Sequence, residues 1–72
     1  MFFVYVLRSK QNNSFYIGFT ENLKERLEKH SKGLVQSTKR YMPMELIYFE
    51  GYKSKKDALI REARLKHFAK GF

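Results

Sequence analysis

The 72-residue sequence has no cysteine, a single proline and no long hydrophobic run. Without cysteine there is neither a disulfide framework nor a thiolate metal site. The apolar stretch MFFVYVL, residues 1–7, has no basic residue ahead of it and is too short for a signal-peptide core or a membrane span. We interpret it as a buried strand. We expect one domain, residues 1–72, in the reducing cytoplasm, with a core packed by seven Phe and five Tyr.

Acidic residues are also scarce. Fifteen Lys and Arg stand against seven Asp and Glu, which gives a net charge of +8 spread along the whole chain. A folded domain with this charge repels itself, so a polyanion such as nucleic acid is the partner that compensates it. A generic basic surface is the alternative. We expect no membrane binding, because no predicted helix combines a wide apolar face with exposed aromatic residues.

The hydrophobic pattern predicts an α+β fold, a small three-stranded antiparallel sheet flanked by helices in the order β-β-α-β-α. Capping boxes open both helices, with Asn22 and Glu25 in the first and Ser54 and Asp57 in the second. The connection at 34–43 is basic, has room for one helical turn and ends at Pro43. The predicted strands are residues 2–8, 14–19 and 44–52, and the predicted helices are 22–32 and 54–68.

The first two strands are expected to form a hairpin. If Arg8 and Asn13 close a four-residue loop, Tyr5 lies directly opposite Tyr16. Residues directly opposite each other in an antiparallel pair share one face of the sheet. The pattern therefore predicts two tyrosines side by side on that face.

Two helical positions stand out at about 100° per residue. Arg26 and His30 lie one turn apart on the first helix, beside the apolar stripe that contains Leu27. On the second helix, Glu62 falls inside the apolar sector near Ala58. A carboxylate there costs several kcal/mol, roughly, unless it is paired or binds a cation. Glu62 is therefore either an ion-pair anchor or a functional group.

In this order and spacing, these residues resemble the GIY-YIG nuclease family, in particular its small single-domain members. The YIG signature is present as Tyr16-Ile17-Gly18, and Phe3-Val4-Tyr5 stands in place of Gly-Ile-Tyr. Eleven positions separate Tyr5 from Tyr16 and ten separate Tyr16 from Arg26. The resemblance covers nearly the whole chain.

The resemblance implies phosphodiester hydrolysis with one divalent metal ion, Mg²⁺ or Mn²⁺, held by Glu62. Mg²⁺ often accepts just one or two carboxylates and takes its other ligands from water and phosphate. The resemblance also places Tyr5, Tyr16, Arg26 and His30 around the scissile phosphate. A tyrosine with an ordinary pKa near 10 is a poor base, so we assign this role to the two tyrosines jointly, with His30 assisting.

Weaker expectations concern contacts with the nucleic-acid backbone. Gly18 lets the strand bend or the phosphate backbone approach closely. Lys39, Arg40, Lys55 and Lys56 are either phosphate contacts or plain surface.

Three functional interpretations remain. The first is a metal-dependent endonuclease, a monomer or weak dimer that acts on DNA in preference to RNA. The second is a catalytically weak or inactive nucleic-acid-binding module, because residues 63–72 lack the asparagine that commonly follows the glutamate in this family. The third is a structural or protein-interaction domain that uses exposed aromatic residues.

Overall fold

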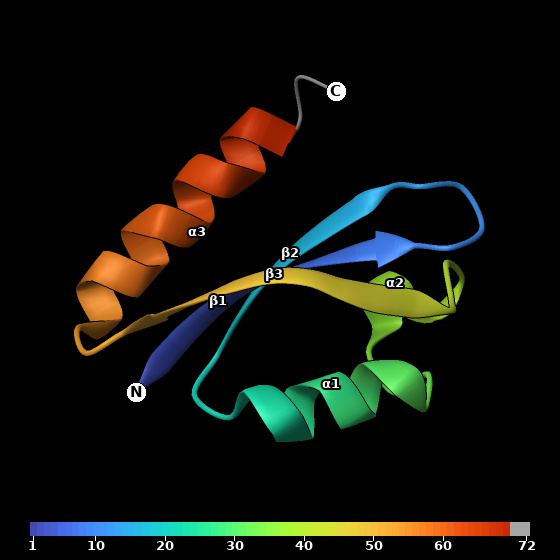
Figure 1. Cartoon of the computed structure of the whole chain (residues 1–72), viewed down its shortest axis with the longest axis horizontal. Coiled ribbons are helices and arrows are strands. Elements are labelled where there is room, and N and C mark those ends of the chain that lie inside the picture. Colours follow the sequence, from blue (N-terminus) through green and yellow to red (C-terminus); the bar gives the residue numbers. More distant parts are fainter. Residues whose placement is uncertain (70–72) are drawn as a thin grey trace.

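The computed structural model describes residues 1–69 and contains one sheet with helices on both faces (Figure 1). The three strands are antiparallel in the order β2-β1-β3, so the first strand is central. The predicted α+β class and the β-β-α-β-α order are confirmed, with α2 as a single turn in the connection. In chain order, the elements are β1 (Phe2–Ser9), β2 (Phe15–Thr20), α1 (Leu23–Ser31), α2 (Gln36–Lys39), β3 (Met44–Tyr52) and α3 (Lys55–Ala69).

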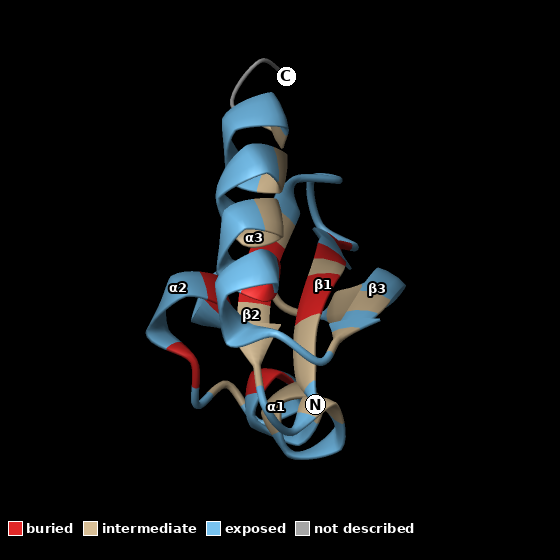
Figure 2. Cartoon of the chain, turned by 90° about the vertical axis from the view of Figure 1, so that its left-hand side faces the viewer, coloured by how far each residue is buried: buried red, intermediate tan, exposed pale blue. Residues whose placement is uncertain are grey.

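The two faces of the sheet are covered by different helices (Figure 1). Successive side chains of a strand point to opposite faces. Val4 packs with Ile17 and with Ala58 of α3, whereas its neighbour Tyr5 bonds to His30 of α1. Figure 2 shows buried residues where the sheet meets the helices. The core is therefore split into an α3 side and an α1 side by the central strand.

The predicted hairpin register is wrong by two residues. Tyr5 pairs with Gly18, and Leu7 pairs with Tyr16. Strand β1 extends to Ser9, whose N–H donates to the Ser14 carbonyl at 2.9 Å, and the loop is Lys10–Asn13. Asn13 has φ of 62°, a conformation that asparagine tolerates better than most residues. Because a shift of two residues keeps every side chain on its face, both tyrosines still share one face.

Both predicted caps are confirmed. The Asn22 side chain accepts a hydrogen bond from the Glu25 N–H at 3.1 Å, and the Ser54 hydroxyl accepts one from Asp57 at 3.2 Å. These bonds satisfy N–H groups that lack partners within the helix. Gly33, with φ of 72°, follows the end of α1. The two long helices begin and end within one residue of the predicted bounds.

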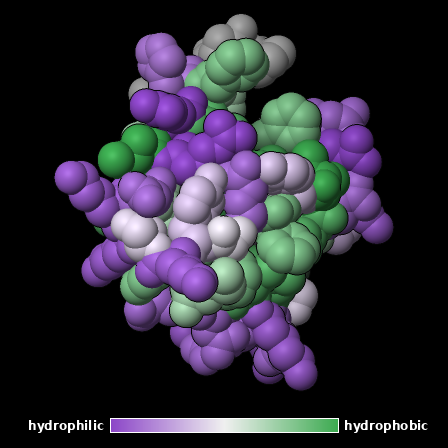
Figure 3. All heavy atoms as spheres, turned by 60° about the vertical axis from the view of Figure 1, so that its left-hand side comes forward, coloured by the Kyte–Doolittle hydropathy of each residue, from purple (hydrophilic) through white to green (hydrophobic). Residues whose placement is uncertain are grey.

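On the face shown in Figure 3, hydrophobic side chains lie among hydrophilic ones. Strand β3 lies at an edge of the sheet and exposes Leu46, Ile47, Tyr48 and Phe49.

Within residues 1–69, no helix is both long and apolar enough to cross a bilayer.

Candidate active site

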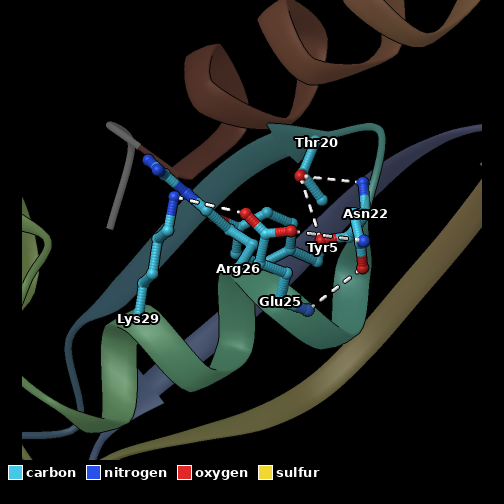
Figure 4. A network of polar contacts seen from close by, with 6 residues as sticks. All are labelled: Tyr5, Thr20, Asn22, Glu25, Arg26 and Lys29. Atoms are coloured by element: carbon cyan, nitrogen blue, oxygen red, sulfur yellow. Dashed lines mark hydrogen bonds and ion pairs between the residues drawn. The ribbon is translucent and has the colours of Figure 1, made fainter.

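Four of the residues predicted for the site come together between the sheet and α1. The Tyr5 and Tyr16 rings lie 6.3 Å apart between centroids, and the His30 ring is 5.6 Å from Tyr5 and 5.2 Å from Tyr16. Arg26 approaches Tyr5 from the first turns of α1, which Asn22 caps (Figure 4). Tyr5 and His30 are buried, while Tyr16 and Arg26 are half-buried.

A chain of hydrogen bonds runs through the buried hydroxyl of Tyr5. The Thr38 hydroxyl donates to the Val35 carbonyl at 3.4 Å, so it accepts from His30 Nδ1 at 2.8 Å. His30 Nε2 then has no proton and accepts from the Tyr5 hydroxyl at 2.8 Å. Arg26 Nε donates to the same hydroxyl oxygen at 3.3 Å. Every donor in this chain therefore has an acceptor.

The electrostatics agree with this assignment of protons. Burial, and then the charge of Arg26, lower the pKa of His30 to about 4. Burial raises the pKa of Tyr5 above its ordinary value of 10.0, against the opposing hydrogen bond from Arg26. The hydrogen bond to Tyr5 in turn raises the pKa of Arg26. At neutral pH the site thus holds a neutral imidazole, a neutral phenol and a guanidinium cation.

Gly18 lies against the ring of Tyr5. A Cβ atom at this position would lie 2.2 Å from Cζ and 2.4 Å from the hydroxyl oxygen of Tyr5. Gly18 is buried, and the Tyr5 ring occupies the space beside it. The glycine therefore makes room for the buried tyrosine.

Glu62 projects from α3, which covers the opposite face of the sheet. Arg61, the preceding residue, bonds to Glu50 of β3. Because consecutive helical residues are about 100° apart, Glu62 does not point in the same direction as Arg61. Lys66 lies one turn beyond Glu62 and lines a hollow together with Tyr16 of β2. Lys66, the ion-pair partner of Glu62, thus lies near the outer strand β2.

The prediction that Glu62 lies near the buried stripe of α3 is confirmed, since its side chain is only 17% exposed. Its partner is Lys66, whose Nζ lies 3.3 Å from Oε2 and whose side chain is 55% exposed. The pair is an i,i+4 contact at the surface, and such pairs contribute about 0.3–0.5 kcal/mol. Glu62 is therefore not the anchor of a buried cation.

Comparison with known proteins agrees with this geometry. The family model of the GIY-YIG catalytic domain matches residues 1–70. The chain belongs to the GIY-YIG family. GIY-YIG domains form a superfamily of nucleases, and this chain is a member of it.

Curated GIY-YIG relatives carry the name UPF0213 protein. The chain is 42% identical to one from Pediococcus pentosaceus over 66 residues, which are 90% of this chain and 68% of the relative. It is 38% identical to one from Streptococcus pneumoniae, over 89% of this chain and 65% of the relative. A third, from Clostridium perfringens, is 37% identical over 92% of this chain and 71% of the relative. The chain thus spans about two thirds of these relatives. No solved structure matches the chain.

GIY-YIG nucleases generally use a divalent metal ion, and the carboxylate of Glu62 fits one. Within residues 1–69, no group of three or more His, Cys, Asp or Glu side chains could hold a metal. A hard ion such as Mg²⁺ binds through one or two carboxylates and keeps its waters. The single, partly exposed carboxylate of Glu62 suits that mode, with Lys66 as the cation displaced.

The four basic residues predicted to contact phosphate fall into two groups. Lys39 and Arg40 precede β3 and line a hollow on α2. Lys55 and Lys56 begin α3, just after the other end of β3. At about 3.3 Å per residue, the nine residues of β3 separate the groups by roughly 25 Å. The hollow that Lys39 and Arg40 line shares Tyr41 with a second hollow, which Tyr16 lines.

Thr38 is a site residue that the sequence analysis missed. Its hydroxyl fixes the proton on His30, yet it lies in a connection without a clear hydrophobic period. The clamp between Glu50 and Arg61 was missed for a similar reason, because it joins β3 to α3 across eleven positions. Neither contact has a signature in local sequence.

Proposed function

We propose that this GIY-YIG chain is a metal-dependent endonuclease that hydrolyses phosphodiester bonds. The proposal includes DNA as the preferred substrate, Mg²⁺ or Mn²⁺ as the metal, and a monomer or weak dimer as the active form. The observation that carries it is the hydrogen-bond chain from Arg26 through Tyr5 to His30, beside the partly exposed Tyr16. A guanidinium held in this way is organised to meet a phosphate.

Arg26 is the group that binds the scissile phosphate. Its Nε is directed at Tyr5, and this contact fixes the plane of the guanidinium. The terminal nitrogens then donate to phosphoryl oxygens as negative charge develops. Because the hydrogen bond to Tyr5 raises the pKa of Arg26, the cation persists throughout the working pH range.

The two tyrosines have separate roles in this proposal. Tyr16 is half-buried at the edge of β2, so its hydroxyl meets the attacking water or the phosphate. Tyr5 is buried, and both Arg26 and His30 engage its hydroxyl. Tyr5 is therefore a positioning residue that orients Arg26. His30 and Thr38 hold Tyr5 in place in turn.

Glu62 would hold the metal ion, which when bound supplies Lewis acidity toward the phosphate and its leaving oxygen. Lys66 would move from Glu62 to a phosphate oxygen as the substrate binds. Both changes require only side-chain motion at a partly exposed surface.

Replacing Glu62 with glutamine tests the proposal. Glu62→Gln is expected to abolish Mg²⁺- or Mn²⁺-dependent nicking of plasmid DNA, because the ligand charge is lost while the shape stays. Nucleic-acid affinity should stay within a few fold. Stability should change by less than about 0.5 kcal/mol, since Lys66, the partner of Glu62, is 55% exposed. Glu28→Gln, an exposed position on α1, is the matched control and should nick normally.

A second candidate, a binding module without turnover, rests on two observations. The Lys66 ammonium already pairs with the Glu62 carboxylate, which is the proposed metal ligand. Burial raises the pKa of Tyr5, which makes this tyrosine a poorer general base. The parent chain decides between the candidates. If it binds DNA and structured RNA but cleaves neither across a wide range of metals, the endonuclease proposal is wrong.

A further inference from the structure

A small hollow lies beside Tyr16, between the hairpin loop and α2. It measures about 250 Å³ and is open to solvent on one side. This is below the range of about 300–1,000 Å³ typical of sites for drug-sized ligands. Its size suits a single small planar group. Its walls are formed by Asn12, Ser14, Phe15, Tyr16, Ser37, Thr38, Tyr41 and Met44.

The walls of this hollow are held together before any ligand arrives. The buried Ser9 hydroxyl donates to the Tyr41 carbonyl at 2.7 Å, and the Lys10 N–H donates to the Pro43 carbonyl at 2.9 Å. Gln11 Nε2 donates to the carbonyls of Arg40, at 3.3 Å, and Met42. These bonds tie the hairpin loop to the segment that follows α2. The hollow is therefore pre-formed, and little ordering cost remains for a ligand.

The lining combines aromatic rings with polar groups. Phe15, Tyr16 and Tyr41 supply the rings. Asn12 Oδ1 accepts from the Ser14 N–H at 3.1 Å, which turns the amide Nδ2 of Asn12 toward other acceptors. The hydroxyls of Ser14 and Ser37 add donors and acceptors. Proteins that read unpaired bases use this combination, stacking on an aromatic ring with hydrogen bonds to the base edge.

Phosphate-binding groups lie on both sides of the hollow. Tyr41 and Ser37 also line the neighbouring hollow that contains Lys39 and Arg40. The Arg40 guanidinium carbon lies 5.7 Å from the centre of the Tyr41 ring. On the other side, Tyr16 stands next to the buried Tyr5, to which Arg26 is bonded. A nucleotide chain that passes Arg26 and then Arg40 therefore carries a base past this hollow.

We propose that the hollow between the hairpin loop and α2 accepts one unstacked nucleobase, next to the phosphate that Arg26 binds. The inference rests on the proposed function in taking nucleic acid as the ligand, and it narrows the substrate to strands with an unpaired nucleotide there. Thr38 connects the two sites, because it lines the hollow and bonds to His30. The absence of a carboxylate from the lining also favours this ligand over a basic peptide.

The test separates base binding from phosphate binding. The probes are a single-stranded oligothymidylate of about 12 nucleotides, within the usual range of site sizes, and an oligonucleotide of equal length made of abasic sites. Both are titrated in the presence of a chelator, so that nothing is cleaved. The parent chain should bind the oligothymidylate about tenfold more tightly, which is the order of one base stacked on an aromatic ring.

Variants at Tyr41 then test whether this hollow causes the preference for the oligothymidylate. Tyr41→Ala should bring the two affinities to within about twofold of each other, whereas Tyr41→Phe, which keeps the ring, should preserve the tenfold ratio. Phe49→Ala is the matched control, an exposed aromatic on β3, and should also preserve it. An oligonucleotide with one 2-aminopurine should lose fluorescence on binding to the parent but not to Tyr41→Ala. Thermal unfolding checks that each variant is folded.

Two results would overturn the inference. One is equal binding of both probes by the parent, and the other is an unchanged ratio in folded Tyr41→Ala. Neither depends on cleavage. A chain that prefers bases but never cleaves contradicts the endonuclease and keeps the base site, whereas a chain that cleaves without base preference contradicts the base site alone.

Discussion

Gly18 shows how closely one residue limits another in this fold. The Tyr5 ring lies against the bare backbone of Gly18, its cross-strand partner, and its hydroxyl is engaged by Arg26 and His30. The ring cannot move without breaking those bonds. A glycine in the family signature thus has a packing role in this chain.

Gly18→Ala is therefore expected to reduce stability by about 1–3 kcal/mol, as overpacking of a filled core does. Cleavage should fall with it, because Arg26 loses its orienting partner. Denaturant unfolding measures the loss. Gly51→Ala is the matched control, since its Cβ would meet the flexible Met1 Sδ at 3.3 Å. Equal stability of the two variants would contradict the role given to Gly18.

His30 gives the fold a pH dependence of known sign. Its pKa is about 4 when folded and 6.5 in a model peptide, so between these values the unfolded chain binds more protons. Stability is therefore complete above about pH 6.5 and falls as the pH drops toward 4, by about 3 kcal/mol in all. Urea unfolding from pH 7 to 4 measures this. His30→Gln should flatten the curve in that window, and an equally steep curve would assign the dependence to other groups.

At the scale of elements, a polar clamp sets how α3 lies on the sheet. Glu50 of β3 accepts from Arg61 Nε at 2.8 Å and Nη2 at 3.1 Å, and from the hydroxyls of Tyr48 and Tyr52. The hydrogen bond from Arg61 is the main cause of the Glu50 pKa of about 2. The clamp thus ties the middle of α3 to β3.

Glu50→Gln should reduce the free energy of unfolding by about 1–2 kcal/mol at pH 7, a value discounted because the Arg61 side chain is 40% exposed. The difference from the parent should disappear as the pH falls from about 4.5 toward 2, because the carboxylate is then protonated in both states. Glu45→Gln breaks the more exposed pair with Arg8 and is the control. A loss no larger than that of the control would show that the clamp contributes nothing.

At the scale of the whole molecule, the basic residues predicted to contact phosphate lie at the two ends of β3. Lys39 and Arg40 lie beside the hollow that we propose accepts a nucleobase, whereas Lys55 and Lys56 lie at the far end of β3. A short strand bound at the site should therefore contact only the first pair.

Binding of an oligonucleotide of about six nucleotides should weaken steeply as salt rises. Lys39→Ala with Arg40→Ala should reduce the slope of log affinity against log salt by about two, or one per lost phosphate contact. Lys55→Ala with Lys56→Ala removes the same charge and should leave the slope nearly unchanged. Equal slopes for the two double variants would mean that the oligonucleotide does not contact Lys39 and Arg40 beside α2.

The sequence alone determined the fold class, the element order and the helix ends. Alternating apolar residues, two capping boxes and turn residues act within a few positions of one another, so they can be read along the chain. The order of Tyr5, Tyr16, Arg26, His30 and Glu62 was likewise sufficient to indicate the family. The bounds of β3 and the shared face of the two tyrosines were also predictable, because strand period depends on local pattern.

Only the tertiary structure decided which groups meet. The hairpin register depended on Ser9, whose buried hydroxyl bonds to Tyr41, 32 positions away. The burial of Tyr5 and the proton on His30 depended on Gly18 and Thr38, which pack against them from strand β2 and from α2. Local pattern sets which face a side chain occupies. Its pKa and partners depend on burial and on charges brought close by the fold, and these are properties of the folded chain.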